Sequence, residues 1–301
     1  MKRDVRHVPV MLSAVLDILS PAPGQVIVDC TLGLGGHAAA ILERMGPTGR
    51  LIGIDFDPAN IAIAKEKLAN VGRQFELVHN NFAALPTILA EAGVEKADAV
   101  LADLGVASPQ IDDPGRGFSY RQDGPLDMRM DPTRGRTAAA LINQISQREL
   151  ESALLELGDE TDAPQIAELI VRRREIQPIS TTQELMAIVC EARDFTLKRA
   201  AGAKLHPAAR TCQALRILVN RELANLDRLL AVLPDCLRSG GVAALISFHS
   251  GEDRRVKSAF RDGLRGGVYA EMSADPLLAD EAEQKINPRS RSAKLRWARV
   301  L

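Results

Sequence analysis

Short runs of apolar, β-branched residues alternate with longer amphipathic stretches over the first part of this 301-residue chain. Each run is closed by a polar or glycine-containing turn, which is typical of buried strands in a parallel sheet. The predicted strands are residues 25–30, 51–55, 75–79 and 97–102. Because helical stretches separate them, the pattern predicts repeated β-α units and a doubly wound α/β sheet.

Several helix boundaries are marked by residues that favour helix ends. Asp57 stands before Pro58, and a capping aspartate followed by proline is a common helix start. The helix that begins near His37 is expected to stop at Gly46, because glycine often ends helices. Further N-terminal capping pairs are predicted at Ser146 with Glu149, Thr181 with Glu184, and Ser250 with Asp253.

The pattern changes after Asp103. Residues 111–132 are rich in Asp, Gly, Pro and Arg, and this segment is too long for an ordinary connection. Helical periodicity without strand signals then continues for roughly eighty residues. We therefore expect residues 113–212 to form an inserted, mostly helical domain, and residues 1–112 and 213–301 to form the sheet domain.

A long helix is expected after the insertion, ending before Ser239. Its leucines at helical spacing are Leu215, Leu218, Leu223, Leu226 and Leu230. The sheet pattern then resumes at residues 242–248, and an alternating stretch at residues 295–301 closes the chain. Both stretches are predicted to be strands.

Composition narrows the class of protein. A net charge of −1 excludes a nucleic-acid binder that acts through overall positive charge, and an aromatic content of 3% requires an aliphatic core. The four cysteines are scattered without CxxC spacing, so we expect neither a metal site nor a disulfide framework. We find no secretory signal and no apolar run of membrane length, which predicts a soluble cytoplasmic protein.

The stretch of residues 26–37 carries the main chemical signal. An apolar strand ends at Asp29, turns through three glycines and enters an alanine-rich helix, and a second strand ends at Asp55, twenty positions after Gly35. Glycines let a ligand approach the backbone closely, and the distant carboxylate accepts hydrogen bonds from ribose hydroxyls. The pattern predicts a nucleoside cofactor.

The glycine spacing distinguishes between cofactors. The turn reads Gly33-Leu34-Gly35-Gly36, whereas a dinucleotide site has a GxGxxG turn with its pyrophosphate on the helix N-terminus. Because His37 and alanines follow at once, a smaller nucleoside ligand without a pyrophosphate fits better, which indicates S-adenosylmethionine. The alternative is an NAD-dependent oxidoreductase, which predicts a GxGxxG turn and residues for hydride chemistry, and we find neither.

Longer segments resemble a known family. They are residues 7–12, 35–37, 103–120, 123–131, 213–217, 246–250 and 287–296. In order, and over nearly the whole chain, they are similar to the ribosomal RNA small subunit methyltransferase H family, also called MraW; the segment Asp103–Tyr120 is very specific. The resemblance implies a Rossmann-like, S-adenosylmethionine-dependent methyltransferase. Its implied target is the N4 amine of a cytosine in the decoding region of 16S rRNA, within the assembled small ribosomal subunit.

The resemblance also gives candidate cofactor-binding residues. Gly35, Gly36 and His37 are placed against the methionine portion of the cofactor, although His37 could simply begin a helix. Asp55 matches the ribose-binding acid. Phe82 is expected to contact the adenine, with an ordinary core phenylalanine as its alternative.

Asp103 ends the fourth predicted strand, at the sheet edge where ligands of such folds bind. In methyltransferases that act on exocyclic amines, this position accepts a hydrogen bond from the target amine. Asp103 could equally contact the cofactor, so we assign it both the catalytic and the cofactor-binding role. Gln110, in the following loop, is implied by the resemblance to reach the cofactor.

Three regions are candidates for RNA contact. Phe118 and Tyr120 either cradle the target base or anchor their loop. Every charge in residues 285–301 is positive. The basic residues Arg289, Arg291, Lys294 and Arg296 of this tail are expected to contact RNA phosphates, with a solvated surface loop as the alternative. Arg172–Arg174 fits RNA and solvent equally well. The inserted domain as a whole is expected to recognise folded RNA by shape.

Two further functions stay open at this point. One is a non-catalytic RNA or ribosome assembly factor that keeps the fold, against which the intact Gly35, Gly36, Asp55 and Asp103 argue. The other is a methyltransferase with a DNA or protein substrate, against which only the resemblance argues.

Overall fold

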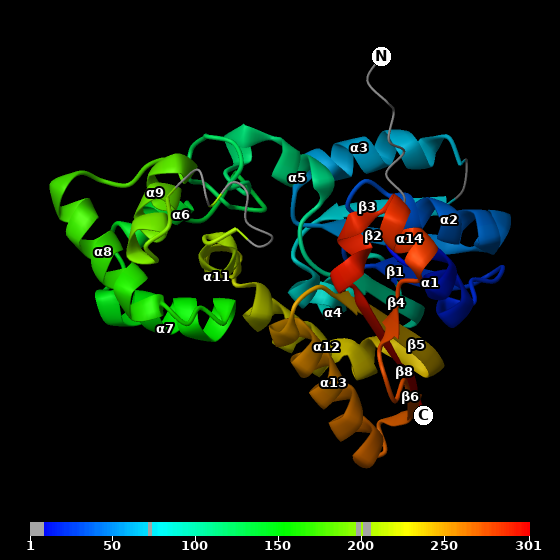
Figure 1. The fold of residues 1–301 in the computed structure, drawn as a ribbon. Coiled ribbons are helices and arrows are strands. Elements are labelled where there is room, and N and C mark those ends of the chain that lie inside the picture. Colours follow the sequence, from blue (N-terminus) through cyan, green and yellow to red (C-terminus); the bar gives the residue numbers. More distant parts are fainter. Residues whose placement is uncertain (1–8, 72–73, 197–199, 201–205) are drawn as a thin grey trace. The chain divides into compact units, whose positions relative to one another are not determined.

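The computed structural model describes residues 9–71, 74–196, 200 and 206–301, and they form two compact units (Figure 1). The sheet unit comprises the chain up to Gly105 together with Leu223–Leu301, and the helical unit comprises Val106–Glu222. The boundaries predicted at residues 112 and 213 differ from these positions. Residues 106–112 and 213–222 belong to the helical unit, because α11 (Ala209–Asn220) packs on α7 (Gln147–Gly158) within that unit.

The sheet unit is built on one mixed sheet, with the strands in the order β3-β2-β1-β4-β5-β8-β6. The strands are β1 (Val26–Asp29), β2 (Arg50–Asp55), β3 (Gln74–His79), β4 (Ala97–Asp103), β5 (Leu237–Ser247), β6 (Tyr269–Met272), β7 (Leu277–Leu278) and β8 (Lys294–Val300). Strands β1 to β5 pair in parallel, whereas β8 pairs antiparallel with β5, β6 and β7. The parallel, doubly wound sheet expected from the sequence is confirmed; β6 and β7 were not predicted.

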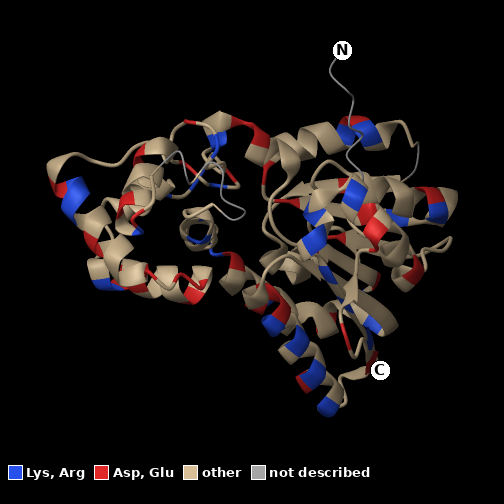
Figure 2. Cartoon of the chain, viewed as in Figure 1, with Lys and Arg blue, Asp and Glu red and all other residues tan. Residues whose placement is uncertain are grey.

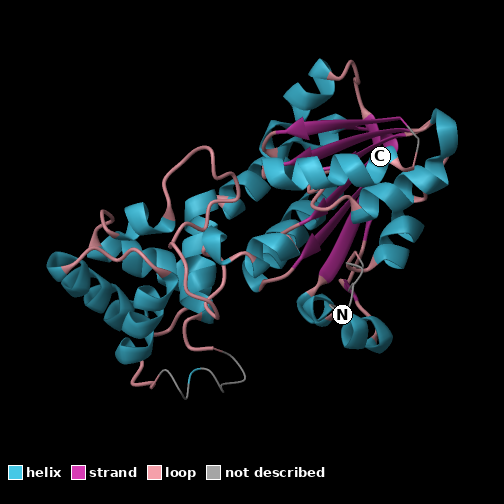
Figure 3. Cartoon of the chain, turned by 90° about the horizontal axis from the view of Figure 1, so that it is seen from above, coloured by secondary structure: helices cyan, strands magenta, loops and turns pink. Residues whose placement is uncertain are grey.

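Helices cover both faces of this sheet (Figure 3). One core holds α1 (Leu12–Leu19), α2 (Gly36–Met45) and α3 (Pro58–Ala69), and the other holds α4 (Leu85–Glu91), α12 (Glu222–Cys236) and α13 (Ser250–Arg265). Within β1, Ile27 faces the first core and Val28 the second. Strands with two apolar faces read as the continuous apolar runs seen in the sequence.

Short elements complete this unit. They are η1 (Gly46–Thr48), η2 (Phe82–Ala84), α14 (Glu281–Ile286) and η4 (Pro288–Ser292). Asp57 caps α3 through a 2.9 Å hydrogen bond from the Ala59 amide, with Pro58 at the first helical position, as predicted. The helix that follows the glycine turn ends at Met45 and Gly46, also as predicted.

The helical unit has its own apolar core. Its remaining elements are α5 (Ser108–Asp112), η3 (Pro114–Arg116), α6 (Ala138–Ile142), α8 (Ala163–Ile176) and α9 (Thr182–Ala192). The capping boxes predicted for α7 and α9 are both present, because Ser146 accepts from the Glu149 amide and Thr181 from the Glu184 amide. Among the described residues of this unit, β structure is limited to one isolated bridge between Pro125 and Thr181.

Two predicted helix boundaries are wrong. The expected long helix is broken at Arg221, whose φ of 52° ends α11, and α12 begins one residue later. At α13 the N-cap residue is His249, one position before the predicted Ser250, because Glu252 accepts hydrogen bonds from the amides of Phe248 and His249. None of the helices in the described ranges is long and apolar enough to cross a membrane.

Candidate functional site

Three aspartates mark the carboxyl edge of the sheet. Asp29, Asp55 and Asp103 are the last residues of β1, β2 and β4, which lie side by side. The sheet order reverses between β1 and β4, so Asp29 and Asp103 stand at the point where ligands of such sheets bind. The sequence predicted Asp55 and Asp103 at strand ends, and the structure brings both to this one edge.

The glycine turn is fixed to Asp55. The Gly33 amide donates to Asp55 Oδ2 at 2.7 Å, and Gly33 and Gly35 have φ angles of 50° and 70°. These left-handed conformations favour glycine. At Gly36 the constraint is steric, because a Cβ atom there would lie 2.5 Å from Pro9 Cγ. The turn is therefore a tight backbone cradle supported by the protein itself.

Asp55 also joins this turn to the start of α3. Its Oδ1 accepts from the Asp57 amide at 2.8 Å and from Asn60 Nδ2 at 3.2 Å. Burial raises the pKa of Asp55, and the three hydrogen bonds oppose that rise. Asp57, and not Asp55, caps α3, and the role of Asp55 in binding ribose stays a prediction.

His37 is the second residue of α2 and faces Asp103. Its Nε2 lies 2.9 Å from the carbonyl oxygen of Val10, so this nitrogen donates. The opposite ring nitrogen, Nδ1, lies 3.9 Å from Asp103 Oδ2. His37 therefore lies in the first turn of a helix, and its contact with the cofactor stays a prediction.

Asp103 and Asp29 share Thr31 as a neighbour. The Asp103 amide donates to Thr31 Oγ1 at 2.5 Å, and the Thr31 amide donates to Asp29 Oδ1 at 3.1 Å. Two buried oxygens, Asp29 Oδ2 and Asp103 Oδ1, have no hydrogen-bond partner among the described residues. A buried polar atom without a partner is costly, so these two oxygens mark a place where a ligand can complete the hydrogen bonding.

The buried carboxyl groups of Asp29 and Asp103 have raised pKa values. Burial raises the pKa of Asp29 to about 7, although the Thr31 amide lowers it. Burial, and after it the charges of Asp29 and Glu252, raises the pKa of Asp103 well above its usual range. Carboxylates in this state favour a cationic ligand, because a nearby positive charge stabilises their ionised forms. The sulfonium and ammonium groups of S-adenosylmethionine fit this requirement.

Two predicted cofactor residues, Phe82 and Gln110, make their contacts within the protein. Phe82 begins η2 and packs, partly buried, against the core that includes α4 and α12, so its contact with adenine stays a prediction. Gln110 is buried in α5 of the helical unit, where its Oε1 accepts from the Ala107 amide at 2.8 Å. Its reach toward the cofactor also stays a prediction.

Four residues of this edge were not predicted as site members: Asp29, Thr31, Asn60 and Glu252. Asp29 could have been found, since it ends its strand as Asp55 and Asp103 do. The other three depend on tertiary contacts that no local pattern shows. Among the described residues, no group of three or more His, Cys, Asp or Glu side chains is arranged to hold a metal ion.

The positive C-terminal segment is largely compensated by acids from elsewhere. Arg296 is 3% exposed and its Nε donates to Asp253 Oδ1 at 2.7 Å, while Lys294 Nζ donates to Asp253 Oδ2 at 3.2 Å. The hypothesis that Arg296 meets RNA phosphates is therefore wrong. Figure 2 shows the same mixing of basic and acidic residues along α13. Arg289 and Arg291 on η4 are exposed.

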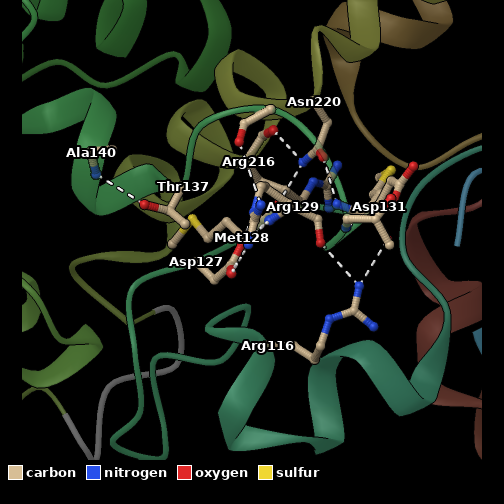
Figure 4. Close-up of polar contacts among 12 residues, drawn as sticks. Arg116, Asp127, Met128, Arg129, Asp131, Thr137, Ala140, Arg216 and Asn220 are labelled. Carbon is tan, nitrogen blue, oxygen red and sulfur yellow. Dashed lines mark hydrogen bonds and ion pairs between the residues drawn. The ribbon is translucent and has the colours of Figure 1, made fainter.

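The long loop of the helical unit is internally cross-linked (Figure 4). Arg129 forms a two-pronged ion pair with Asp127, through Nε at 2.7 Å and a second nitrogen at 2.8 Å. Arg116 donates to the carbonyl oxygens of Arg129 and Met130. Asn220 of α11 accepts from the Met130 amide and donates to the Met128 carbonyl oxygen, each at 2.7 Å. The loop therefore has one defined conformation.

The contacts of Phe118 and Tyr120 favour a role in anchoring their loop. Tyr120 stacks on His206 with ring centroids 4.7 Å apart. Phe118 and Tyr120 both pack against the apolar core of the helical unit. In the arginine run, Arg173 pairs with Glu191, and Arg174 donates to the carbonyl oxygens of Ile142 and Ile145.

Known proteins are similar to this chain over nearly its whole length. The family model described as the MraW methylase family matches residues 4–301. The ribosomal RNA small subunit methyltransferase H of Geotalea uraniireducens is 44% identical, over 98% of each chain, and that of Heliobacterium modesticaldum is 43% identical, over 97% of each chain. Among solved structures, a putative rRNA-methylase from Clostridium thermocellum is similar over 98% of this chain and 99% of its own, with 14% identity and a TM-score of 0.47.

These matches confirm the family expected from the sequence, and with it a methyltransferase. The family is one of S-adenosylmethionine-dependent methyltransferases, so the expected cofactor is confirmed as well. The first segment of the resemblance begins at His7 and Val8, which lie outside the described residues. With a family model matched over nearly its whole length, this chain belongs to the MraW methylase family.

Proposed function

We propose that this protein methylates the N4 amine of a cytosine in the decoding region of 16S rRNA, in the cytoplasm and on the assembled small ribosomal subunit. Relatives that are 43–44% identical over nearly the whole chain are named as methyltransferases of small subunit ribosomal RNA. The observation that carries the amine as the target is Asp103 at the ligand-binding edge of the sheet, whose buried Oδ1 has no hydrogen-bond partner among the described residues.

The main task of the protein in this reaction is to align the reacting atoms. When bound, S-adenosylmethionine supplies an electrophilic methyl group on a sulfonium. Asp103 accepts a hydrogen bond from the target amine, which orients the nitrogen lone pair, and then takes the proton that the amine loses. Holding two reacting atoms in line lowers the barrier by several kcal/mol. The target base must first be unstacked, at a cost of about a few kcal/mol.

Binding of the cofactor uses the residues of the carboxyl edge. Asp55 receives the ribose hydroxyls, and the backbone at Gly35 and Gly36 receives the methionine carboxylate. His37 closes the same end of the site, and Phe82 contacts the adenine. We also assign Gln110 to the cofactor, and the helical unit to recognition of folded RNA.

The test uses small subunits from cells that lack this protein. They are incubated with purified enzyme and methyl-labelled S-adenosylmethionine, and the RNA is digested for nucleoside mass spectrometry. We expect label in N4-methylcytidine at one decoding-region position. With Asp103→Asn, transfer falls by at least 100-fold, whereas the fold measured by circular dichroism is retained.

Other outcomes would contradict the proposal in distinct ways. Label in another nucleoside would show that the N4 amine of cytosine is not the target. Label in free 16S rRNA but not in assembled subunits would show that the enzyme acts before the subunit is assembled. Cofactor binding without any transfer would favour the assembly-factor alternative.

A further inference from the structure

The exposed face of α13 carries a row of basic side chains. Its members are exposed and recur every three or four residues: Arg254, Lys257, Arg261 and Arg265. Residues at this spacing lie on one side of a helix, with neighbouring Cβ atoms about 5 to 6 Å apart. The row is about 16 Å long, at about 1.5 Å of rise per residue. Figure 2 shows basic residues recurring along the length of this helix.

Most of the charge in this basic row is not compensated within the protein. Arg254, Lys257 and Arg265 make no ion pair with any other described residue. Arg261 is the exception, because its Nε lies 3.6 Å from Asp262 Oδ1. The row therefore presents three unpaired positive charges to solvent.

The acids at the start of α13 do not offset the row. Glu252 is 2% exposed, so its charge is not part of the helix surface. Asp253 precedes Arg254 in the chain, but it pairs with Lys294 at 3.2 Å and with Arg296 at 2.7 Å. The two cations of β8 thus neutralise the acid next to the row, and the positive charge of the row dominates this face.

The row is unfavourable for the helix that carries it. Lys257 and Arg261 are four residues apart, and so are Arg261 and Arg265. Like charges at this spacing destabilise a helix, whereas opposite charges stabilise it. Helix stability therefore does not explain the row, and a ligand with many negative charges does.

The opposite face of α13 decides between two such ligands. Val256 and Phe260 are 1% and 0% exposed, and both pack in the core between α13 and the sheet. A helix that binds a membrane surface must place an apolar face in the lipid, and the apolar face of α13 is already buried. A chain of phosphates needs only the positive charges, so a nucleic acid fits the row better than a membrane does.

The row begins near the candidate site. Two residues separate the end of β5 from the start of α13, and on β5 Ile246 is in register with Asp103 of β4. The first turn of α13 therefore lies at the carboxyl edge of the sheet, where Asp103 ends its strand. A phosphate chain that follows the row leads toward this edge.

We propose that the basic row of α13 binds phosphates of the RNA that carries the target base. This inference rests on the proposed function, which makes RNA the substrate. Contacts with phosphates hold the RNA and fix its position, whereas contacts with base edges supply sequence preference. The row thus contributes affinity and orientation, and it leaves the choice of base to the site itself.

The experiment measures binding of the purified protein to small subunits from cells that lack it, without cofactor, from about 50 to 200 mM salt. Arg254→Gln/Lys257→Gln is expected to bind about tenfold more weakly, or less well still. Its plot of log affinity against log salt is expected to be less steep by about 1.4, at about 0.7 for each lost phosphate contact. The matched control, Lys65→Gln/Lys67→Gln, removes the same charge from exposed positions of α3, which belongs to the other core of the sheet unit. It should keep the affinity and the slope of the wild type.

Two further measurements separate charge from folding. Arg254→Lys/Lys257→Arg keeps both positive charges and should keep the salt slope. The thermal midpoint of Arg254→Gln/Lys257→Gln should not fall, because removing like charges does not weaken the helix. An unchanged slope, or an equal loss of affinity in the α3 control, would overturn the inference. Tighter binding to phosphatidylserine vesicles than to small subunits would overturn it as well, and would assign the row to a membrane surface.

Failure of this inference and failure of the proposed function are distinguishable, because binding is measured without methyl transfer. A wild type that binds small subunits through the row but transfers no methyl group would contradict the proposed function alone. A wild type that methylates the subunit, and whose binding is unaffected by Arg254→Gln/Lys257→Gln, would contradict the inference alone.

Discussion

At the scale of single residues, Asp55 has two tasks at once. It accepts three hydrogen bonds from the protein, which join the glycine turn to α3, and it is the carboxylate expected to bind ribose. Asparagine in its place has one acceptor oxygen and no negative charge, so its NH2 group faces one of these donors and a hydrogen bond within the protein is lost as well. Charge-assisted hydrogen bonds are worth about twice as much as neutral ones, so the ligand loses a strong acceptor too.

We predict that Asp55→Asn weakens cofactor binding by at least tenfold, as the loss of about 1.5 to 3 kcal/mol from a hydrogen bond to a charged group implies. Titration calorimetry measures the change. Asp57→Asn is the matched control, because asparagine caps a helix as well as aspartate does, and it should bind the cofactor with the affinity of the wild type. Equal affinities for both variants would remove Asp55 from the cofactor site.

Gly36 provides a second prediction at this scale, and it separates packing from ligand contact. A Cβ atom at Gly36 would lie 2.5 Å from Pro9 Cγ, so Gly36→Ala forces the two segments apart. We expect a loss of about 1 to 3 kcal/mol in the free energy of unfolding, seen as a lower thermal midpoint without cofactor. Gly266→Ala, with its nearest backbone neighbour at 3.3 Å, should change the midpoint little.

The site residues were predictable from the sequence where the signal is local. Asp55 and Asp103 each end an apolar run, and the end of a parallel strand fixes the edge on which they lie. The partner of Arg296 could not be found in this way, because Asp253 is 43 positions away and no pattern links the two.

At the scale of elements, most helices and strands follow the apolar periodicity, and the exceptions have physical causes. Leucines keep a helical spacing through Arg221, so periodicity alone predicts one continuous helix there. The break comes from Arg221, which has a left-handed backbone conformation. Glycine adopts this conformation readily, so a glycine predicts it, whereas an arginine does not. Strands β6 and β7 are short edge elements that depend on β8 for pairing.

Asn220 shows how one side chain can hold an irregular segment. It is buried, makes two 2.7 Å hydrogen bonds to the backbone around Met128 and a third, at 2.9 Å, to the Arg216 carbonyl oxygen. Met128 itself has a φ of 60°, a conformation that is unfavourable for methionine. The contacts of Asn220 offset this strain (Figure 4).

We predict that Asn220→Ala lowers the free energy of unfolding by about 2 to 4 kcal/mol, because buried backbone groups lose their partners. Urea denaturation followed by circular dichroism measures the loss. Asn70→Ala removes one exposed hydrogen bond to the Glu66 carbonyl oxygen and should cost less than about 0.5 kcal/mol. Similar losses for the two variants would show that the loop does not depend on Asn220.

At the scale of the whole molecule, the buried carboxyls make stability depend on pH. The pKa of Asp29 is about 7 in the folded protein and 3.8 as its ordinary value. Between these values the unfolded chain loses the proton that the folded chain keeps. Folding therefore becomes less favourable as the pH rises through this window, by up to about 4 kcal/mol.

This predicts a difference between the wild type and Asp29→Asn. In the absence of cofactor, the thermal midpoint of the wild type should decline, relative to that of the variant, as the pH is raised from 4 toward 7. The comparison with the variant is needed because Asp127, Asp131 and Asp253 have lowered pKa values, and they act in the opposite direction at acid pH. If the thermal midpoints of the two proteins changed in parallel with pH, the result would contradict a raised pKa for Asp29 in the folded protein.

The segment just before α1 has a consequence for handling the protein. The carbonyl oxygen of Val10 holds the His37 ring, Pro9 covers Gly36, and the Met11 amide donates to Glu283 of α14 at 2.7 Å. A change at Pro9, Val10 or Met11 therefore disturbs the contacts that support the cofactor turn. Leu301 follows the last strand and is 70% exposed, so a purification tag added after it meets solvent. Affinities for the cofactor are therefore best measured on protein that carries its tag at Leu301.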